Sequence, residues 1–425
     1  MKKYIVGAVL ICLVLGRAPV SQGAGFLIYE HGAAAMAMGG AFVAVANDPS
    51  AVFHNPAGIA FLKGTQVSVG TTLIWSASQL TLPNYPVASQ REWEQVKQTF
   101  YPSTLYLTQS MGDRVTLGFG FFTPYGLGAE WPKENPLRYL GYKDDMKTFF
   151  FNPVVAVKLT DNVSAGFGVS YIYSTVMFKL VDLLDFTALR LGKYDAPASL
   201  EGDGNAWAFN AGLLYKTDKL SLGFNWRSQF DIKYSGDLTL DTSLVPAPVR
   251  PAVPTSAVGE TTFRFPNIFG VGLAYNATEK LLLSADFHYI NWKRFDRYVV
   301  TFDNPKIATM DIEQNWDNSW LLRGGIQYAF SPKFALRGGL IYDTTPQPEE
   351  VTDPLLPDAN RFALTGGFGI NLTGHLVLDL AYQYEPFNDR TVPNRHVLQV
   401  GSINLGEGTY KTTANLLGVS LRFVF

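Results

Sequence analysis

The sequence predicts an all-β protein, a transmembrane antiparallel β-barrel of about 14 strands. An N-terminal hatch of short helices and turns is expected to plug its lumen. The first observation is composition, with 14% aromatic residues, 39 glycines and only 16% charged residues, where soluble domains carry about 25% charged residues. The second is a strict two-residue alternation of apolar and polar side chains. The third is the alternation of short and long connections. Composition alone leaves a soluble β-sandwich or β-helix open.

The chain begins with the pattern of a secretory signal. Lys2 and Lys3 precede an apolar run at 4–15 that is too short to span a membrane as a helix. We therefore expect residues 1–23 to be a cleaved signal peptide. Cys12 is the sole cysteine and lies inside that peptide, so disulfides are excluded from the mature chain. The remaining 31 basic and 36 acidic residues, a net charge of about −5, provide no basic field for nucleic acid.

The alternation is clearest in three stretches, 163–173, 220–227 and 376–385. In each, one face is apolar with aromatic residues toward its ends, and the other is polar or glycine, as lipid and its interfaces require. The candidate strands are 66–79, 102–111, 114–127, 148–160, 162–180, 204–217, 219–235, 259–277, 279–301, 312–330, 332–346, 358–372, 374–387 and 412–425.

The connections alternate in length along the chain. Short turns are predicted at 112–114, 160–162, 217–219, 276–280, 331–333 and 373–374, and long loops at 80–101, 128–147, 181–203, 236–258 and 388–411. Barrels of the bacterial outer membrane have short periplasmic turns and long outer loops. An even strand number places every short turn and both termini on the periplasmic side.

The last strand alternates apolar residues and ends on Phe425. This ending resembles the assembly signal of bacterial outer-membrane proteins. We therefore expect Phe425 to engage the barrel-assembly machinery, and the barrel to contact outer-membrane lipid and lipopolysaccharide. The predicted location is the bacterial outer membrane.

Residues 24–64 lie outside the strand pattern, which occupies 65–425. They are rich in small residues, turns and apolar side chains. The lumen of so wide a barrel is not filled by its own side chains, and irregular backbone at membrane depth is tolerated only inside protein or a wet cavity. We therefore expect this segment to be a hatch folded into the lumen. The alternative, a disordered periplasmic tail, conflicts with its apolar content.

A search for reactive groups finds no catalytic set. The five histidines lack metal-ligand spacing, so we expect no metal, no cofactor and no enzymatic activity. The stretch 201–205 has a faint likeness to a calcium-binding loop. A plain turn is the simpler interpretation of this stretch. Charged residues on the predicted inner faces form a lumen network: Arg227, Asp286, Arg323, Arg337, Asp379 and Arg422.

Four short motifs carry a family resemblance. "AGF" at 24–26, "NPA" at 55–57, "YGL" at 125–127 and the terminal phenylalanine resemble the FadL/TodX family of outer-membrane transporters of fatty acids and aromatic hydrocarbons. The resemblance covers essentially the whole mature chain. It implies a fourteen-stranded barrel with an N-terminal hatch, in which Asn55, Pro56 and Ala57 form the hatch motif.

The resemblance also implies lateral release of substrate at a kink in the third strand. The segment 121–128, "FFTPYGLG", has suitable chemistry, because proline cannot donate to the ladder and glycine leaves space. The expected kink residues are Pro124, Tyr125, Gly126, Leu127 and Gly128. The alternative is a strand that ends at a loop.

The ligand pocket is expected from the same resemblance. Fatty-acid members hold the carboxylate with basic side chains at positions that correspond here to Lys179 and Asp317. An aspartate repels an anion, so the sequence favours neutral hydrocarbon-like ligands, although Arg227, Arg323 or Arg337 could bind a carboxylate. The predicted pocket comprises Phe149, Met177, Phe178, Lys179, Trp316, Asp317 and Trp320.

Three functions compete. Passive transport of hydrophobic small molecules, with release into the membrane, is the leading one. A general hydrophilic porin predicts an open lumen and no apolar hatch. An outer-membrane lipid-modifying enzyme predicts a Ser–His pair at one interface.

Overall fold

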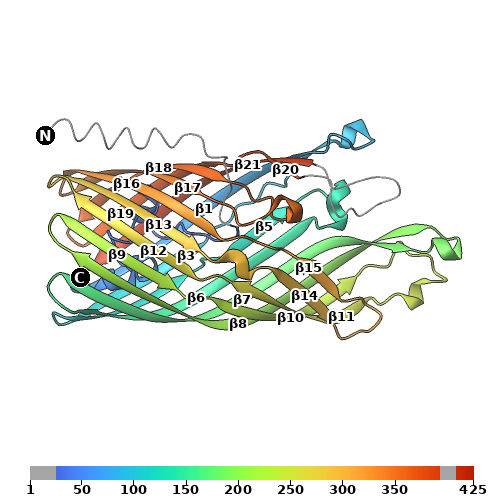
Figure 1. Ribbon diagram of the computed structural model, residues 1–425, viewed down its shortest axis with the longest axis horizontal. Coiled ribbons are helices and arrows are strands. Elements are labelled where there is room, and N and C mark those ends of the chain that lie inside the picture. The colour runs from blue at the N-terminus through green and yellow to red at the C-terminus, as the bar shows by residue number, and fades with distance from the viewer. Residues whose placement is uncertain (1–24, 393–407) are drawn as a thin grey trace.

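A computed structural model describes residues 25–392 and 408–425. The predicted signal peptide, residues 1–23, lies outside the described residues. The strands form one closed antiparallel barrel of 14 strands, which confirms the predicted fold class (Figure 1). The first and last barrel strands close it, because β1 pairs with β21 from Gln66↔Val424 to Thr81↔Thr409.

Nine barrel strands are continuous and five are interrupted in the described part of the chain. The continuous strands are β1 (Thr65–Thr81), β3 (Ser103–Met111), β6 (Lys143–Lys158), β7 (Val163–Asp185), β8 (Lys193–Lys216), β17 (Phe334–Asp343), β18 (Arg361–Thr373), β19 (Leu376–Pro386) and β21 (Gly408–Val424). The interrupted strands are β4 (Val115–Phe122) with β5 (Gly126–Glu130), β9 (Leu220–Arg227) with β10 (Phe230–Leu240), β11 (Ser256–Phe265) with β12 (Ile268–Asn276), β13 (Leu281–Ile290) with β14 (Arg297–Phe302), and β15 (Met310–Glu313) with β16 (Ser319–Ser331). Two short strands, β2 (Glu92–Glu94) and β20 (Arg390–Val392), pair with β1 and β21.

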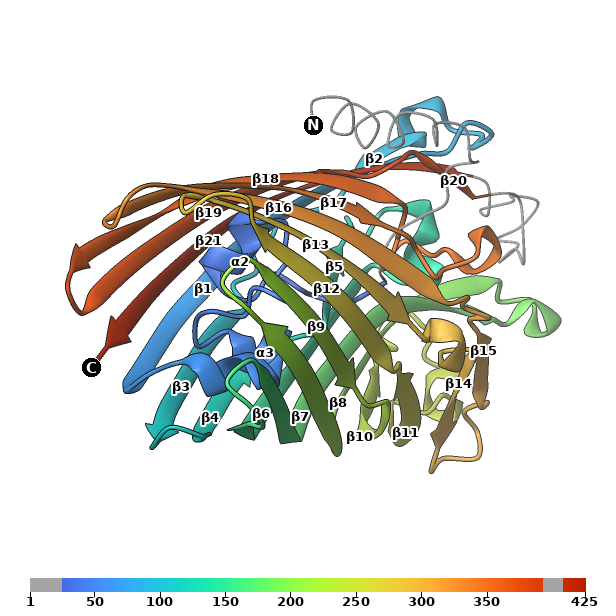
Figure 2. The ribbon, with the colours of Figure 1, turned by 60° about the vertical axis from the view of Figure 1, so that its left-hand side comes forward.

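Helices are short. The α-helices are α2 (Ala33–Ala37) and α3 (Ala51–His54), and the 3₁₀ helices are η1 (Pro56–Phe61), η2 (Ala88–Gln90), η3 (Pro136–Tyr139), η4 (Thr187–Leu189), η5 (Arg250–Ala252), η6 (Trp292–Arg294) and η7 (Glu349–Val351). Within 25–392 and 408–425, no helix is long and apolar enough to cross a membrane. Figure 2 shows α2 and α3 in the interior, surrounded by strands.

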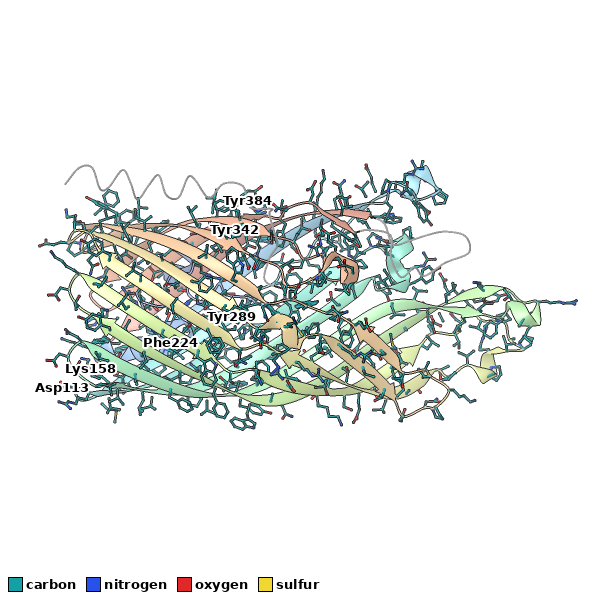
Figure 3. All side chains as sticks on the ribbon, in the orientation of Figure 1. Asp113, Lys158, Phe224, Tyr289, Tyr342 and Tyr384 are labelled. Atoms are coloured by element: carbon teal, nitrogen blue, oxygen red, sulfur yellow. The ribbon has the colours of Figure 1, made fainter. Side chains whose placement is uncertain are left out.

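The strands bury one face and present the other outward, as the alternation predicts. In β8, Trp207 and Phe209 are exposed, whereas the intervening Ala208 is buried. Figure 3 labels Tyr289 and Tyr384 on the outer surface, where the two side chains are 38% and 40% exposed. Aromatic side chains at this position suit the interface between hydrocarbon and water.

One predicted loop is wrong. Residues 181–203 form the outer part of a long hairpin, because β7 and β8 stay paired from Val163↔Tyr215 to Asp185↔Lys193. This hairpin projects beyond the rest of the barrel at the end away from the C-terminus (Figure 1). Above the membrane both faces of a strand can meet water, so the alternation that marks a strand within the bilayer is lost there.

Closure of the barrel predicts resistance to detergent. Every backbone group in a closed sheet has its partner within the protein, so SDS has few free groups to attack. Unheated protein in SDS should therefore migrate differently from boiled protein on a gel. Identical migration before and after boiling, with a helical circular dichroism spectrum, would contradict the closed barrel.

Candidate functional site

The third barrel strand is broken at Thr123–Tyr125. Both of its halves pair with β6, through Phe122↔Phe150 before the break and Gly126↔Lys147 after it. The broken strand thus advances four residues while its partner advances three. The extra residue is a bulge, which bends a strand and re-aims it. Pro124 lies within the break and has no N–H to donate.

Beyond the break, the third strand parts from the second. The ladder between β3 and β4 ends at Leu105↔Phe121, and in the described residues β5 has a ladder only with β6. The N-terminal segment, residues 25–64, takes the vacated edge. The Ile28 N–H donates to the Pro124 carbonyl at 2.8 Å, and the Gly126 N–H donates to the Phe26 carbonyl at 3.1 Å.

Phe26 occupies an aromatic cage beside this edge. Its ring packs mostly edge-to-face against five others, with centroids 4.7 to 6.3 Å away: Tyr125, Phe265, Trp292, Phe295 and Trp316. Such geometry contributes about 0.5–1.5 kcal/mol per pair beyond burial. The cage therefore fixes the start of the N-terminal segment against the kink. Trp316, a predicted pocket residue, belongs to it.

Asn55 joins two parts of the segment to the barrel wall. Its Nδ2 donates to the carbonyls of Val43 at 2.8 Å and Leu213 at 3.1 Å. Its Oδ1 accepts from the Ala57 N–H at 3.1 Å and caps η1, where Pro56 occupies the first turn. The asparagine thus satisfies backbone groups that the proline-containing turn cannot pair by itself.

The wall leaves room for this motif. A Cβ added at Gly166 would collide with Pro56, and one at Gly212 with Asn55. Both glycines face inward from β7 and β8. Their missing side chains allow the N-terminal segment to approach the strand backbone.

Inward charged residues hold the rest of the segment. The Asp286 carboxylate accepts from the N–H groups of Phe42 and Val43, at 2.7 and 2.8 Å. Arg323 covers the Tyr29 ring at 3.9 Å, and Arg227 donates to the Phe53 carbonyl. These three predicted lumen charges therefore bind the segment rather than one another.

The other predicted lumen charges lie apart from the segment. Arg337 pairs with Asp379 at 2.6 Å and donates to Gln327 at 2.7 Å. Arg422 is half-buried, and its Nε has no hydrogen-bond partner among the described residues.

A cavity of about 790 Å³ opens at the kink. Its walls come from Phe26 and Ile28, from β1, and from Gly126 and Gly128. Most of the lining is apolar. The cavity is also lined by side chains of both faces of the barrel: Glu30, Arg361 and Glu385 inside, and Tyr101, Phe121 and Phe149 toward the outer surface. Its lining thus includes residues of both faces of the wall, where the segment 95–102 lies between β1 and β5 and bonds to both strands.

The inner end of the cavity is charged. Arg361 binds Asp343 at 2.9 Å, and its Nε lies 4.0 Å from Glu385. The Gln383 amide donates to Glu385 at 2.5 Å and to Glu30 at 3.1 Å.

Asp358, in the outer loop between β17 and β18, also lines this end. Its carboxylate accepts from the Gly25 N–H at 2.9 Å and from the Thr345 hydroxyl. Burial raises the pKa of Asp358 above its ordinary value, because water no longer solvates the ionised form.

The seven predicted pocket residues are not brought together. Trp316 lies in the aromatic cage, Phe178 packs beside Phe263, and Phe149 lines the cavity from outside. The others lie elsewhere: Met177 is half-buried on β7, Lys179 pairs with Glu201 at 3.8 Å, Trp320 packs on Tyr342, and Asp317 is exposed.

Sequence reasoning missed the charged end of the cavity. Gln383 and Glu385 share the polar face of their strand with Asp379. Their inward direction could therefore have been predicted from the alternation of the sequence. The contribution of Glu30 was not, because it comes from the irregular N-terminal segment and meets Gln383 only across 353 positions of sequence.

Comparison with known proteins identifies the group to which the chain belongs. Residues 15–425 match the family model described as outer membrane protein transport protein (OMPP1/FadL/TodX). Outer membrane protein P1 of Haemophilus influenzae is 25% identical over 429 residues, covering 90% of this chain and 91% of that protein. The long-chain fatty acid transport protein of Escherichia coli K12 is 21% identical, covering 90% of each.

Two solved structures share the fold. A Pseudomonas aeruginosa FadL homologue superimposes with a TM-score of 0.82 at 20% identity, over 95% of this chain and all of that one. The Pseudomonas putida toluene transporter TodX gives 0.72 at 17% identity, again over 95% and 100%. This chain therefore belongs to the OMPP1/FadL/TodX family of outer-membrane transporters of hydrophobic compounds.

Proposed function

We propose that this protein carries hydrophobic small molecules passively across the outer membrane and releases them sideways into the lipid. The observation that carries the proposal is the cavity at the kink, because its lining joins lumen-facing Glu30 and Glu385 to outward-facing Phe121 and Phe149. An apolar molecule can pass from such a cavity to the bilayer without crossing bulk water. The names of two relatives, a fatty acid transport protein and a toluene transporter, support this class of cargo.

The N-terminal segment serves in this proposal as a plug. Asn55, Arg227 and Asp286 connect it to the neighbouring strands β8, β9 and β13, and Ser420 connects it to β21. Nearly all of residues 26–62 are buried. A hydrophilic porin needs an open water path through that space. Transport of apolar molecules through the side of the barrel does not.

The cargo that fits best is not a free carboxylate. Arg361, the cation at the inner end of the cavity, already binds Asp343 at 2.9 Å, and neighbouring carboxylates disfavour another anion. Lys179, the basic residue expected for a fatty-acid head group, pairs instead with Glu201. We therefore favour neutral hydrocarbon-like cargo over long-chain fatty acids.

Replacing Asn55 should loosen the plug. The change Asn55→Ala removes three hydrogen bonds and leaves the carbonyls of Val43 and Leu213 without this donor, a cost of about 2–4 kcal/mol. We expect larger and more frequent conducting events in planar bilayers. Asn276→Ala is the control, because Asn276 bonds only at an exposed turn. Equal conductance of the two variants would contradict a plug held by Asn55.

Narrowing the cavity at Gly128 should slow the uptake of apolar molecules. A Cβ at Gly128 would already meet the Phe100 ring, so Gly128→Leu should narrow the cavity and lower the rate of apolar-dye transfer into liposomes by about tenfold. Gly374→Leu is the matched control, since nothing lies within 4 Å of a Cβ added there. Full transfer by a correctly folded Gly128→Leu barrel would refute lateral release.

A further inference from the structure

The inner end of the cavity has an excess of acidic groups. Three carboxylates line it, those of Glu30, Asp358 and Glu385, and the one lining cation beside them, among the described residues, is Arg361. The second lining cation, Lys147, belongs to the outer face and binds Asp145 at 2.6 Å. The inner end therefore offers acceptors for a donor-bearing group rather than donors for an anion.

Arg361 carries one positive charge, so it can balance only part of the charge of these carboxylates. Both its Nε, at 3.0 Å, and its Nη2, at 2.9 Å, are directed to Asp343 behind the cavity wall. Its Nε is 4.0 Å from the nearer oxygen of Glu385, beyond hydrogen-bond distance. The guanidinium is thus committed to a carboxylate that does not line the cavity.

Glu385 has an open acceptor. The Glu385 side chain is 5% exposed. The Nε2 of Gln383 donates both to Oε1 of Glu385 and to Oε1 of Glu30. Among residues 25–392 and 408–425, the donor recorded beside the Oε2 of Glu385 is Arg361, at 4.0 Å. A buried carboxylate is costly unless its oxygens are paired, so a ligand cation could pair with Glu385 at hydrogen-bond distance, closer than Arg361 does.

The rest of the cavity suits an apolar body. Phe26, Ile28 and Phe100 line it, and Leu355 and Leu416 continue the apolar wall. Its volume of about 790 Å³ is in the range of pockets that enclose small organic ligands. Charge at one end and apolar wall along the remainder match an amphiphile with a single small head group.

We infer that this cavity binds apolar amines, with the alkylammonium group at Glu385 and Glu30 and the hydrocarbon toward Phe100 and Gly128. The ammonium supplies up to three N–H donors and one positive charge. A carboxylate head group would add a negative charge instead. The inference rests on the proposed function and extends its cargo from neutral hydrocarbons to amphiphiles with a cationic head group.

The test compares three ligands of one chain length. Full-length protein in zwitterionic lipid nanodiscs is titrated at pH 7.5 with dodecylamine, 1-dodecanol and sodium dodecanoate, with quenching of tryptophan fluorescence as the readout. Empty nanodiscs correct for partition into lipid. We expect dodecylamine to bind at least about tenfold more tightly than dodecanoate, with 1-dodecanol between them.

Variants assign the preference to the site. Glu385→Gln keeps the shape and removes the charge, so it should reduce the advantage of dodecylamine about tenfold while 1-dodecanol binding changes by less than about twofold. Glu30→Gln is the second variant if Glu385→Gln does not fold, as judged by heat-dependent migration in SDS. Glu313→Gln, an exposed glutamate on β15, is the matched control and should leave all three affinities unchanged.

Two results overturn the inference in distinguishable ways. If dodecanoate binds as tightly as dodecylamine, or both variants keep the amine preference, the head-group assignment is wrong while hydrophobic transport stands. If none of the three ligands binds, the proposed function fails as well.

Discussion

The constraint on which this structure depends is the need to pair every backbone N–H and C=O at membrane depth. Lipid offers no partner, so an unpaired group there costs several kcal/mol. The closed sheet meets the requirement almost everywhere. Where the third strand breaks at Thr123–Tyr125, β3 no longer pairs with it, and Phe26 and Ile28 provide the missing partners. The N-terminal segment therefore supplies part of the pairing that the break removes, and the Thr148 hydroxyl pairs the Tyr125 backbone.

The same constraint explains the polar interior. The N-terminal segment is too irregular to pair its own backbone, so inward side chains do so. Asp286 accepts from two successive N–H groups, Asn225 donates to the His54 carbonyl at 2.5 Å, and Ser164 donates to the Ala57 carbonyl at 2.8 Å. Charged residues in this lumen thus act mainly as partners for backbone. Arg361 and Glu385 differ from these residues, because they line the cavity and bond to side chains.

Much of the barrel was predictable because bilayer and lumen impose opposite chemistry on alternate residues. The strand around 163–173 and the terminal strand ending near Phe425 follow that pattern closely. The pattern fails where the environment is uniform, as in the β7–β8 hairpin beyond the membrane. The break in the third strand lies at Pro124, one of the residues that the sequence singles out. Its pairing with Phe26 was not, because nothing local to either segment specifies the other.

The seam between β1 and β21 has a consequence for biogenesis. It unites residues more than 300 positions apart, such as Gln66 and Val424, and the same last strand reaches the interior, where Ser420 accepts from the Ala33 N–H at 3.0 Å. Contacts this distant in sequence form slowly, because a long chain must be ordered first. The N-terminal segment and β1 therefore complete their contacts only after the last strand, β21, is in place. A chain truncated before β21 leaves the edge of β1 unpaired and also removes the Ser420 contact to the N-terminal segment. Because the two defects occur together, quality control that recognises an unpaired strand edge would detect both.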